Sequence, residues 1–465
     1  MKQITGKEIL EATGGRLLAG DGREPLFHLS IDSRSMRGGD LFIPLIGEKT
    51  DGHRYILQAM ENGARAALTC RHETAPEEFA GTLIRVEDTK RALQEIGVFL
   101  RRRLSIPLVG VTGSVGKTTT REMVAAALSA GFRTFRTPAN HNSQIGVPLT
   151  LSEIAKEDEI GVLELGMSEP GEMEIIARMA AVDTAIITNI GVTHIENLGS
   201  RENILREKLH IQDGMKDGGV LFLNGDNDLL REVTAREGLA TVRYGCSDGC
   251  AYRAEAAEST AGGCTFTLVC EKGRFPVRLS VPGSHNVSNA LAALAAADHY
   301  GVPLPAAIEA LGRFTGVKNR QQIVSRNGLT IIDDTYNASP DSVKAGLSVL
   351  ASLPATRRIA VLADMKELGE RAEEFHREVG RFLAGQPVDL LVTFGSLARW
   401  IEEGAKEAAS SALSVVSFSE ADRASMEAFL REELRAGDAV LFKGSNSMRL
   451  GTAAALFTGE EAPAH

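Results

Sequence analysis

Residues 106–131 read IPLVGVTGSVGKTTTREMVAAALSAG, and the order of parts in this stretch predicts a strand, a glycine loop and a helix. The apolar run 106–111 is typical of a buried strand in a parallel sheet. A helical pattern covers 120–130, and the loop before it carries Gly113 and Gly116. A glycine loop between a strand and a helix N-terminus is the local structure that binds polyphosphates.

The residues of this loop have the chemistry that a nucleotide requires. Glycines let backbone N–H groups close around phosphate oxygens, Lys117 supplies a positive charge, and the Thr118 hydroxyl is a hard oxygen ligand for Mg2+. Val111 stands where the usual eight-residue motif has its first glycine, so the motif is the shorter T-G-S-x-G-K-T. A simple turn is the alternative interpretation, but Gly-Lys-Thr-Thr entering a helix favours an ATP site. Its candidate residues are Thr112, Gly113, Ser114, Val115, Gly116, Lys117, Thr118 and Thr119.

The composition predicts an ordinary soluble protein of several domains. The chain has 465 residues, of which 43% are hydrophobic and 24% charged, and this length suggests about three domains. The net charge of −10 argues against a protein that coats nucleic acid. No signal peptide and no membrane-spanning run is recognisable. The five cysteines form no C-x-x-C pair, which argues against structural zinc and predicts reduced thiols in the cytoplasm.

The expected fold class is α/β with three domains. Residues 1–105 combine short strands with an amphipathic helix expected over 89–103, as a small α/β domain does. Residues 106–315 alternate strands and helices around the phosphate loop, which predicts a mostly parallel sheet, and 250–282 has the pattern of a β-hairpin. Residues 316–465 hold four apolar strand candidates separated by helical patterns, so we expect a Rossmann-like, doubly wound parallel sheet there.

Three polar residues of the central segment stand at positions where a site can form. Glu164 lies at the end of an apolar strand, His194 follows the expected strand 184–190, and Lys208 lies on a helix expected over 201–216. Taken singly, the glutamate could be an ion-pair partner, the histidine merely exposed and the lysine solvated. The carboxyl ends of parallel strands meet at one sheet edge, beside the phosphate loop, which favours a shared site for all three.

Two polar turns mark the first segment. Asp32, Ser33 and Arg34 follow an apolar run, and Asp-Gly-His at 51–53 forms the second turn. A helix cap and a tight turn are the simple structural interpretations. The functional alternative is a loop that offers a hydroxyl and a guanidinium to an anionic ligand.

Seven motifs together resemble a known family. They occur in the order seen in the Mur ligases of peptidoglycan synthesis: TGSVGKTTT, ELGMSEPGEM, THIENLGSRENILREK, GSHNVSNALAA, KNRQQ, DDTYNASPDS and KGSNSMRL. The N-terminal DSR…GDLFIPLIGEKTDGH pattern and DDTYNASPDS are most similar to the branch that joins D-alanyl-D-alanine to UDP-N-acetylmuramoyl-tripeptide. The sibling branch, which adds the diamino acid, usually carries Asp-Asn-Pro-Arg in its last domain, and that motif is not found here.

The resemblance implies an enzyme, an ATP-dependent acid–D-amino-acid ligase that works through an acyl phosphate and releases ADP and phosphate. ATP and two Mg2+ ions are the implied cofactors, with Lys208 carbamylated. Residues 1–105 would bind the UDP substrate, 106–315 would bind ATP, and 316–465 would bind the incoming D-alanyl-D-alanine. A cytoplasmic monomer with no nucleic-acid partner and no transmembrane segment is expected.

The resemblance also implies roles for single residues. Lys117 would hold the outer phosphates, Thr118 and Glu164 would bind one Mg2+, and His194 with carbamylated Lys208 would bind the second. An unmodified lysine ammonium could not do so, because it has no lone pair. Further contacts are implied at Asn286, Asn289 and Asp334 for the adenosine, Arg320 for the γ-phosphate, Ser33 and Arg34 for the UDP group, Asn140 and Asn142 for the muramoyl-peptide, and Asn337 and Ser339 near the dipeptide.

Two kinds of alternative stay open. The first is a sibling amide ligase, either the enzyme that adds the diamino acid or one like folylpolyglutamate synthase, although the folate enzymes lack an N-terminal domain with the DSR…DGH pattern. The second is a nucleotide-dependent switch that uses ATP without ligation. In such a switch, Glu164, His194 and Lys208 would have no chemical purpose.

Overall fold

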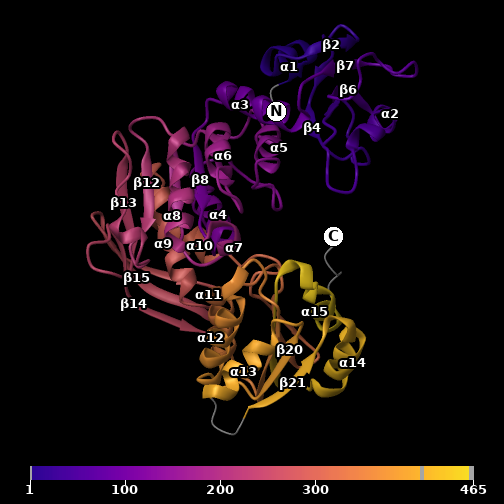
Figure 1. Cartoon of the computed structure of the whole chain (residues 1–465). Helices are drawn as coiled ribbons and strands as arrows, with labels where there is room; N and C mark the ends of the chain where they lie inside the picture. The colour runs from indigo at the N-terminus through magenta and orange to yellow at the C-terminus, as the bar shows by residue number, and fades with distance from the viewer. Residues whose placement is uncertain (1–2, 409–412, 460–465) are drawn as a thin grey trace.

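The computed structural model describes residues 3–408 and 413–459, which form three large sheets with helices packed against them (Figure 1). The chain runs from the indigo N-terminal sheet through the magenta central part to the orange and yellow C-terminal part. This arrangement confirms the expected α/β class. Over the described ranges, no helix has the length and apolar character needed to cross a membrane.

The N-terminal sheet has five strands in the order β2-β7-β6-β5-β4. Only the β2–β7 pair is antiparallel, and a two-stranded ribbon of β1 and β3 lies apart from the sheet. The strands are β1 (Ile4–Thr5), β2 (Arg16–Ala19), β3 (Pro25–Leu26), β4 (His28–Ser30), β5 (Asp40–Phe42), β6 (Ala64–Thr69) and β7 (Thr82–Arg85). The helices are α1 (Gly6–Thr13), α2 (Ile56–Glu61) and α3 (Thr89–Arg103), with a 3-10 turn η1 (Gly52–Tyr55).

The central sheet has nine strands in the order β16-β15-β14-β13-β12-β11-β8-β10-β9. It is parallel from β9 to β14 and antiparallel through β14, β15 and β16, which confirms the mostly parallel sheet with a hairpin. The strands are β8 (Leu108–Thr112), β9 (Thr134–Arg136), β10 (Ile160–Glu164), β11 (Thr184–Ile187), β12 (Val220–Asn224), β13 (Ala240–Gly245), β14 (Tyr252–Thr260), β15 (Gly263–Cys270) and β16 (Gly273–Leu279).

Helices cover both faces of the parallel part of this sheet. One face packs α4 and the alanine-rich α9 against Val109 and Val111, and the other face packs α3, α5 and α6 against Leu108 and Leu163. The helices are α4 (Lys117–Leu128), α5 (Gly146–Glu153), α6 (Glu172–Ala180), α7 (Ile195–Leu198), α8 (Arg201–Leu209), α9 (His285–His299) and α10 (Leu304–Gly312), with 3-10 turns η2 (His210–Gly214) and η3 (Leu230–Glu232). Burial on both faces explains why β8 reads as a continuous apolar run.

The C-terminal sheet has six strands in the order β17-β18-β22-β19-β20-β21, and all pairs except β17–β18 are parallel. This is the expected doubly wound arrangement. The strands are β17 (Gln322–Arg326), β18 (Leu329–Asp334), β19 (Arg357–Ala363), β20 (Leu390–Phe394), β21 (Ser414–Phe418) and β22 (Asp438–Lys443). The helices are α11 (Pro340–Ser352), α12 (Ala372–Ala384), α13 (Arg399–Ala408), α14 (Arg423–Glu433) and α15 (Leu450–Thr458), with 3-10 turns η4 (Gly369–Arg371), η5 (Glu420–Asp422) and η6 (Asn446–Met448).

Helix α3 connects the N-terminal sheet to the central one. It packs against α1 on one side and against α5 and α6 on the other, and Figure 1 shows it between the two parts. The Arg101 guanidinium is buried and donates to the carbonyls of Ala180 and Ala181 and to the Asp183 carboxylate. The chain therefore passes from the first sheet to the second through a packed helix rather than a free linker.

Candidate active site

The phosphate loop has a backbone that only glycine fits at its first bend. Strand β8 ends at Thr112, and Gly113 follows with φ +146°. A Cβ at position 113 would lie 1.9 Å from the Thr188 hydroxyl oxygen. Gly116 has φ +86° and immediately precedes α4, so the loop ends in the left-handed conformation that glycine adopts without cost. Helix α4 therefore begins at Lys117, three residues before the expected start.

The segment after β11 holds the loop in shape. The backbone N–H groups of Ser114 and Val115 donate to the backbone and side-chain oxygens of Asn189, at 3.0 and 2.9 Å. The Thr188 hydroxyl donates to the Val115 carbonyl at 2.7 Å. These contacts use residues that we expected to be in a strand, which explains why β11 ends at Ile187.

Lys117 lies where several charges of the site converge. Its Nζ donates to the Gly113 carbonyl at 2.8 Å. Burial of the ammonium lowers the pKa of Lys117, the negative charges of Glu164 and Glu367 oppose this, and the positive charge of Arg320 adds to it. These charged side chains come from β10 and from two loops of the C-terminal segment, and all three lie close enough to Lys117 to affect its pKa.

Glu164 is buried at the end of β10 and is held by two donors. Arg121 Nη1 donates to Oε2 at 3.1 Å, and Asn142 Nδ2 donates to Oε1 at 2.8 Å. Each carboxylate oxygen has a second lone pair, so the carboxylate can still bind a cation. Arg121 was not among the expected residues, although it lies one helical turn after Lys117 on α4. Asn142 is the residue expected near the muramoyl-peptide, and its side chain is one of these two donors.

Lys208 is a lysine inside the protein, with 1% of its surface exposed. Within the part of the chain that the structure describes, its Nζ makes no hydrogen bond and no ion pair. Burial, and after it the positive charge of Lys117, lower the pKa of Lys208 well below its usual value, while Glu207 opposes the shift. The Glu207 carboxylate itself accepts the backbone N–H groups of Gly171 and Met173, at the start of α6, at 3.0 and 2.9 Å.

His194 and Glu367 meet across the boundary between the central and C-terminal sheets. His194 Nδ1 lies 2.6 Å from Glu367 Oε2, although the two groups are not aligned for a good hydrogen bond. The contact with His194 lowers the pKa of Glu367. Glu367 was not among the expected residues, but the polar DMKELG stretch directly after the apolar strand β19 is the type of signal that could have indicated it.

The asparagines of α9 lie against the phosphate loop helix. The Thr120 hydroxyl donates to Asn289 Oδ1 at 3.0 Å, and Asn289 Nδ2 donates to Asn286 Oδ1 at 3.1 Å. Asn286 Nδ2 in turn donates to the Pro282 carbonyl at 2.7 Å. A Cβ at position 116 would lie 3.2 Å from Asn289 Oδ1. Both asparagines are therefore placed beside the expected ATP site.

A second charged group lies at the carboxyl ends of β18 and β22. Lys443 Nζ donates to Asp334 Oδ2 at 2.7 Å and to the Asn337 carbonyl at 3.0 Å, and both charged side chains are buried. The Arg320 guanidinium stacks on the Tyr336 ring at 3.8 Å from its centroid. Burial lowers the pKa of Lys443, Asp334 opposes this, and Arg320 adds to it. Lys443 begins the KGSNSMRL motif but was not among the expected site residues.

The other expected residues lie outside the group around Lys117 and outside the group around Lys443. Ser339 caps the start of α11 together with Ser342, and Asn140 is exposed. Ser33 is buried and donates to Gln58 Oε1 at 3.1 Å. Arg34 is exposed and pairs with Asp32 at 2.8 Å. Among the described residues, no hydrogen bond or ion pair links Ser33 or Arg34 to the phosphate loop.

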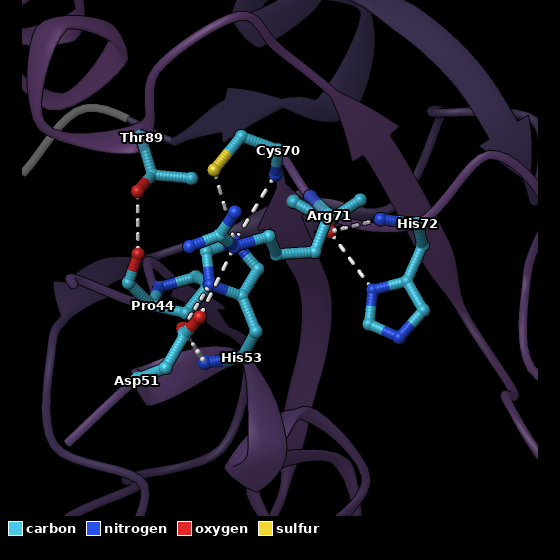
Figure 2. A network of polar contacts seen from close by, with 8 residues as sticks. Pro44, Asp51, His53, Cys70, Arg71, His72 and Thr89 are labelled. Atoms are coloured by element: carbon cyan, nitrogen blue, oxygen red, sulfur yellow. Dashed lines mark hydrogen bonds and ion pairs between the residues drawn. The ribbon is translucent and has the colours of Figure 1, made fainter.

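The Asp-Gly-His turn is the centre of a polar network in the N-terminal part (Figure 2). His53 is buried, its Nδ1 lies 2.6 Å from Asp51 Oδ1, and its Nε2 accepts the backbone N–H of Cys70 at 3.1 Å. Arg71 Nε donates to Asp51 Oδ2 at 3.1 Å. These donors, the His53 backbone N–H first among them, lower the pKa of Asp51 to about 2. The network fixes the turn from both sides.

A cavity of about 580 Å³ lies next to this network. Cys70 and three arginines contribute to it, together with the start of α3; the lining residues are Ala12, Thr13, Gly14, Gly15, Arg16, Cys70, Arg85, Val86, Glu87, Asp88, Arg91, Ala92 and Glu95. Ser33 and Arg34 are not among them.

The site fits Mg2+ by the chemistry of its donors. No group of three or more His, Cys, Asp or Glu side chains that could hold a metal alone occurs within residues 3–408 and 413–459. Magnesium in nucleotide sites usually takes only one or two protein ligands, and phosphates and water supply the rest. Thr118 and Glu164 provide hard oxygens beside the loop. The buried, unpartnered Lys208 Nζ fits a second site only after it has become a carboxylate.

Comparisons with known proteins agree along nearly the whole chain. Residues 27–98 match the model for the Mur ligase family catalytic domain, 111–297 the Mur ligase middle domain, and 319–446 the Mur ligase glutamate ligase domain. The UDP-N-acetylmuramoyl-tripeptide–D-alanyl-D-alanine ligase of Bacillus subtilis is 37% identical over 461 residues, which cover 97% of each chain.

Solved structures give the same result. A crystal structure of MurF from Acinetobacter baumannii superposes with a TM-score of 0.89 at 30% identity and covers 99% of this chain and 100% of that one. The MurF ligase of Thermotoga maritima in complex with ADP has a TM-score of 0.81 at 29% identity, with 93% and 97% covered.

Proposed function

The chain belongs to the Mur ligase family, and from this premise we propose how its own residues carry out the family's reaction. It is an ATP-dependent ligase that joins D-alanyl-D-alanine to UDP-N-acetylmuramoyl-tripeptide, as its MurF relatives are named to do. The names of these relatives favour neither the diamino-acid ligase nor an ATP switch without catalysis. The observation that carries the proposed roles is the convergence of Lys117, Glu164 and Lys208 from three different elements.

The reaction has to make a carboxylate reactive, because a carboxylate is a poor electrophile. An oxygen of the tripeptide's terminal carboxylate attacks the γ-phosphorus of ATP, the bond to the bridging oxygen breaks, and ADP leaves. The amine of D-alanyl-D-alanine then attacks the acyl carbon of the acyl phosphate. The tetrahedral intermediate expels phosphate, the nitrogen loses a proton, and the amide bond is complete.

The phosphate loop would bind the nucleotide that this sequence of steps requires. The backbone N–H groups of Lys117, Thr118 and Thr119 belong to the first turn of α4, where a helix leaves its N–H groups without intrahelical partners. They would bind the phosphates, because a helix N-terminus favours anions. Lys117 would neutralise the β- and γ-phosphates, and Arg320 would stabilise the charge that develops on the γ-phosphoryl group. Because Arg320 comes from the C-terminal segment, its contact would also exclude water from the acyl phosphate.

Two Mg2+ sites are proposed beside the loop. Thr118 and Glu164 would hold one ion, and His194 with Lys208 would hold the other. Bound Mg2+ supplies charge neutralisation during phosphoryl transfer. For Lys208 to act as a ligand, its neutral amine would add to CO2 and lose a proton, which gives a carbamate. The burial of this amine and its lack of a partner support that modification.

The remaining contacts follow the three segments of the chain. Residues 106–315 would bind ATP, with Asn286 and Asn289 near the adenine and Asp334 near the ribose. Residues 1–105 would bind the UDP group through Ser33 and Arg34, and the muramoyl-peptide would pass Asn140 and Asn142. Residues 316–465 would bind D-alanyl-D-alanine near Asn337 and Ser339.

We also propose a cytoplasmic monomer. All residues of the proposed site come from one chain, so no second copy is needed to complete it. The five cysteines are all unpaired, which is the usual state in a reducing compartment.

Phosphate release from ATP and Mg2+ tests the function. We expect release only when UDP-N-acetylmuramoyl-tripeptide and D-alanyl-D-alanine are both present. Release with the dipeptide precursor and a diamino acid instead would identify the sibling ligase. The variant Lys117→Met should lose at least about 100-fold in kcat, as sites do when a donor to the developing charge is removed. The exposed Lys49→Met is its matched control.

A further inference from the structure

The loop that carries Glu367 is fixed firmly to its own sheet. It covers residues 364–371, between β19 and α12. The fully buried Asp364 carboxylate accepts the backbone N–H of Ala398 at 2.7 Å, and the Ser445 hydroxyl accepts that of Lys366 at 2.9 Å. The loop therefore projects from the C-terminal sheet as a rigid part of it.

The same loop contacts the central segment at His194 and α7. The Glu367 carbonyl accepts the Glu196 backbone N–H at 3.3 Å, and the Glu367 carboxylate lies 2.6 Å from His194 Nδ1. Gly369 packs so closely that a Cβ there would lie 3.3 Å from the Glu196 Cα. The Glu367 side chain thus contacts His194, and its backbone contacts Glu196 two residues later.

The residues on both sides of this contact have unusual backbones. Glu367 has φ +65° and His194 has φ +63°, and neither is glycine. Left-handed conformations of such residues are unfavourable and persist where the surrounding structure imposes them, most often at functional sites. Glu367 and His194 both have this conformation and contact each other across one boundary. We take this as a sign that the contact between them is functional.

We propose that Glu367 is a positioning residue that orients the His194 imidazole for catalysis. Histidines that bind a metal through one ring nitrogen commonly donate the other N–H to a carboxylate, which fixes the tautomer and the ring orientation. A carboxylate oxygen 2.6 Å from Nδ1 favours the tautomer with the proton on that nitrogen, which leaves Nε2 as the nitrogen with a lone pair. The inference rests on the metal-binding role proposed for His194.

The origin of the carboxylate adds a second consequence. His194 belongs to the central segment and Glu367 to the C-terminal one, so the imidazole is set only when the two segments are docked. If ATP binds while the two segments are apart, the His194 imidazole is not yet oriented. Docking of the C-terminal segment therefore also orients the imidazole for phosphoryl transfer.

The test compares variants that separate the carboxylate from the backbone. Glu367→Gly removes the carboxylate and leaves a residue for which φ +65° costs nothing, so the loop should keep its shape. Glu367→Gln keeps the size of the side chain without its charge. Glu370→Gln makes the same charge change three residues away, at an exposed carboxylate of the same loop, and is the matched control.

We expect kcat to fall about 10- to 100-fold in Glu367→Gly and Glu367→Gln, the usual range for a lost partner of a metal-binding histidine, with KM for ATP unchanged. Glu370→Gln should stay within about twofold. Long-range 1H–15N spectra of the ATP-free protein give an independent readout: the His194 signals should report Nδ1–H in the wild type and a mixed tautomer in Glu367→Gly.

His194→Asn assigns those signals by their loss and separates the two ideas, since asparagine tolerates the left-handed backbone. If His194→Asn keeps full activity, the proposed role of His194 is wrong. If His194→Asn is inactive while Glu367→Gly keeps wild-type kcat and an unchanged tautomer, only the positioning role of Glu367 is overturned.

Discussion

Asp51 illustrates how the neighbours of one side chain set its charge. Its carboxylate accepts the His53 backbone N–H, contacts the imidazole and pairs with Arg71, and its pKa falls from 3.8 to about 2. A carboxyl whose folded pKa is depressed stabilises the folded state above its unfolded pKa, and that stabilisation is lost as the pH falls through the folded value.

We therefore predict that Asp51→Asn destabilises the turn by about 1 kcal/mol at pH 6. The pKa difference corresponds to about 2 kcal/mol, and we halve it because more than one-third of the side chain is exposed to solvent. The difference between variant and wild type should shrink as the pH drops from 4 towards 2. Hydrogen exchange of β5 and β6 measures it, with the exposed Glu48→Gln as control. A pH-independent difference would contradict the assignment.

Gly113 allows a prediction about steric fit rather than charge. Gly113→Ala places a Cβ 1.9 Å from the Thr188 hydroxyl oxygen, so the loop must move and ADP binding, measured by calorimetry, should be lost. Gly301→Ala is the control, because Gly301 has φ +80° but no atom within 4 Å of an added Cβ. It should cost about 1 kcal/mol of stability and leave ADP binding intact. Equal effects of the two variants would mean that backbone strain, not space, governs position 113.

The site residues that sequence could predict are those with a local signal. Lys117 and Thr118 follow directly from a strand, a glycine loop and a helix. Glu164, His194 and Lys208 were favoured together by their positions at one sheet edge, and the family resemblance then implied a role for each. Arg121 and Glu367 were not expected, because the partners of their contacts, Glu164 and His194, are distant in sequence. The polar stretch after β19 could indicate Glu367, but it does not indicate the partner. Only the folded chain brings each of them to its partner.

Among the elements, α3 shows what periodicity can and cannot predict. Its amphipathic pattern predicted a helix over 89–103, and the structure has the same bounds. The pattern does not say which neighbours the helix packs against, and the packing on α5 and α6 appears only in the fold. Boundaries set by tertiary contacts were also missed: the helix expected over 201–216 is α8 followed by the 3-10 turn η2.

The buried Arg101 makes the role of α3 testable. Arg101→Ala removes the donors to Ala180, Ala181 and Asp183, and leaves the carbonyls unsatisfied. We expect hydrogen exchange of α3 to become faster by an amount that corresponds to about 2 kcal/mol. Arg102→Ala, on the exposed side of the same helix, should change little. Faster exchange in both variants would mean that the loss of a positive charge in the last turn of α3, rather than the loss of the buried contacts of Arg101, weakens the helix.

At the scale of the whole molecule, the C-terminal segment brings Arg320 to the site. Its guanidinium rests on Tyr336, and its charge acts on both Lys117 and Lys443. We predict that Arg320→Ala lowers kcat by about 100-fold with little change in ADP affinity, because its interaction forms with the developing γ-phosphoryl charge. The exposed Arg313→Ala is the control. Unchanged turnover in a folded Arg320→Ala protein would refute the proposed role of Arg320 at the γ-phosphate.

The strand order of the C-terminal sheet also affects how the chain is made. Strand β22, the last one in the sequence, lies in the interior of that sheet between β18 and β19. Strands β18 and β19 leave the ribosome long before β22 is made, so two apolar strand edges stay unpaired until β22 has been synthesised. During that interval the nascent chain is open to aggregation and can be bound by chaperones, and a message truncated before β22 yields a protein without an inner strand of this sheet.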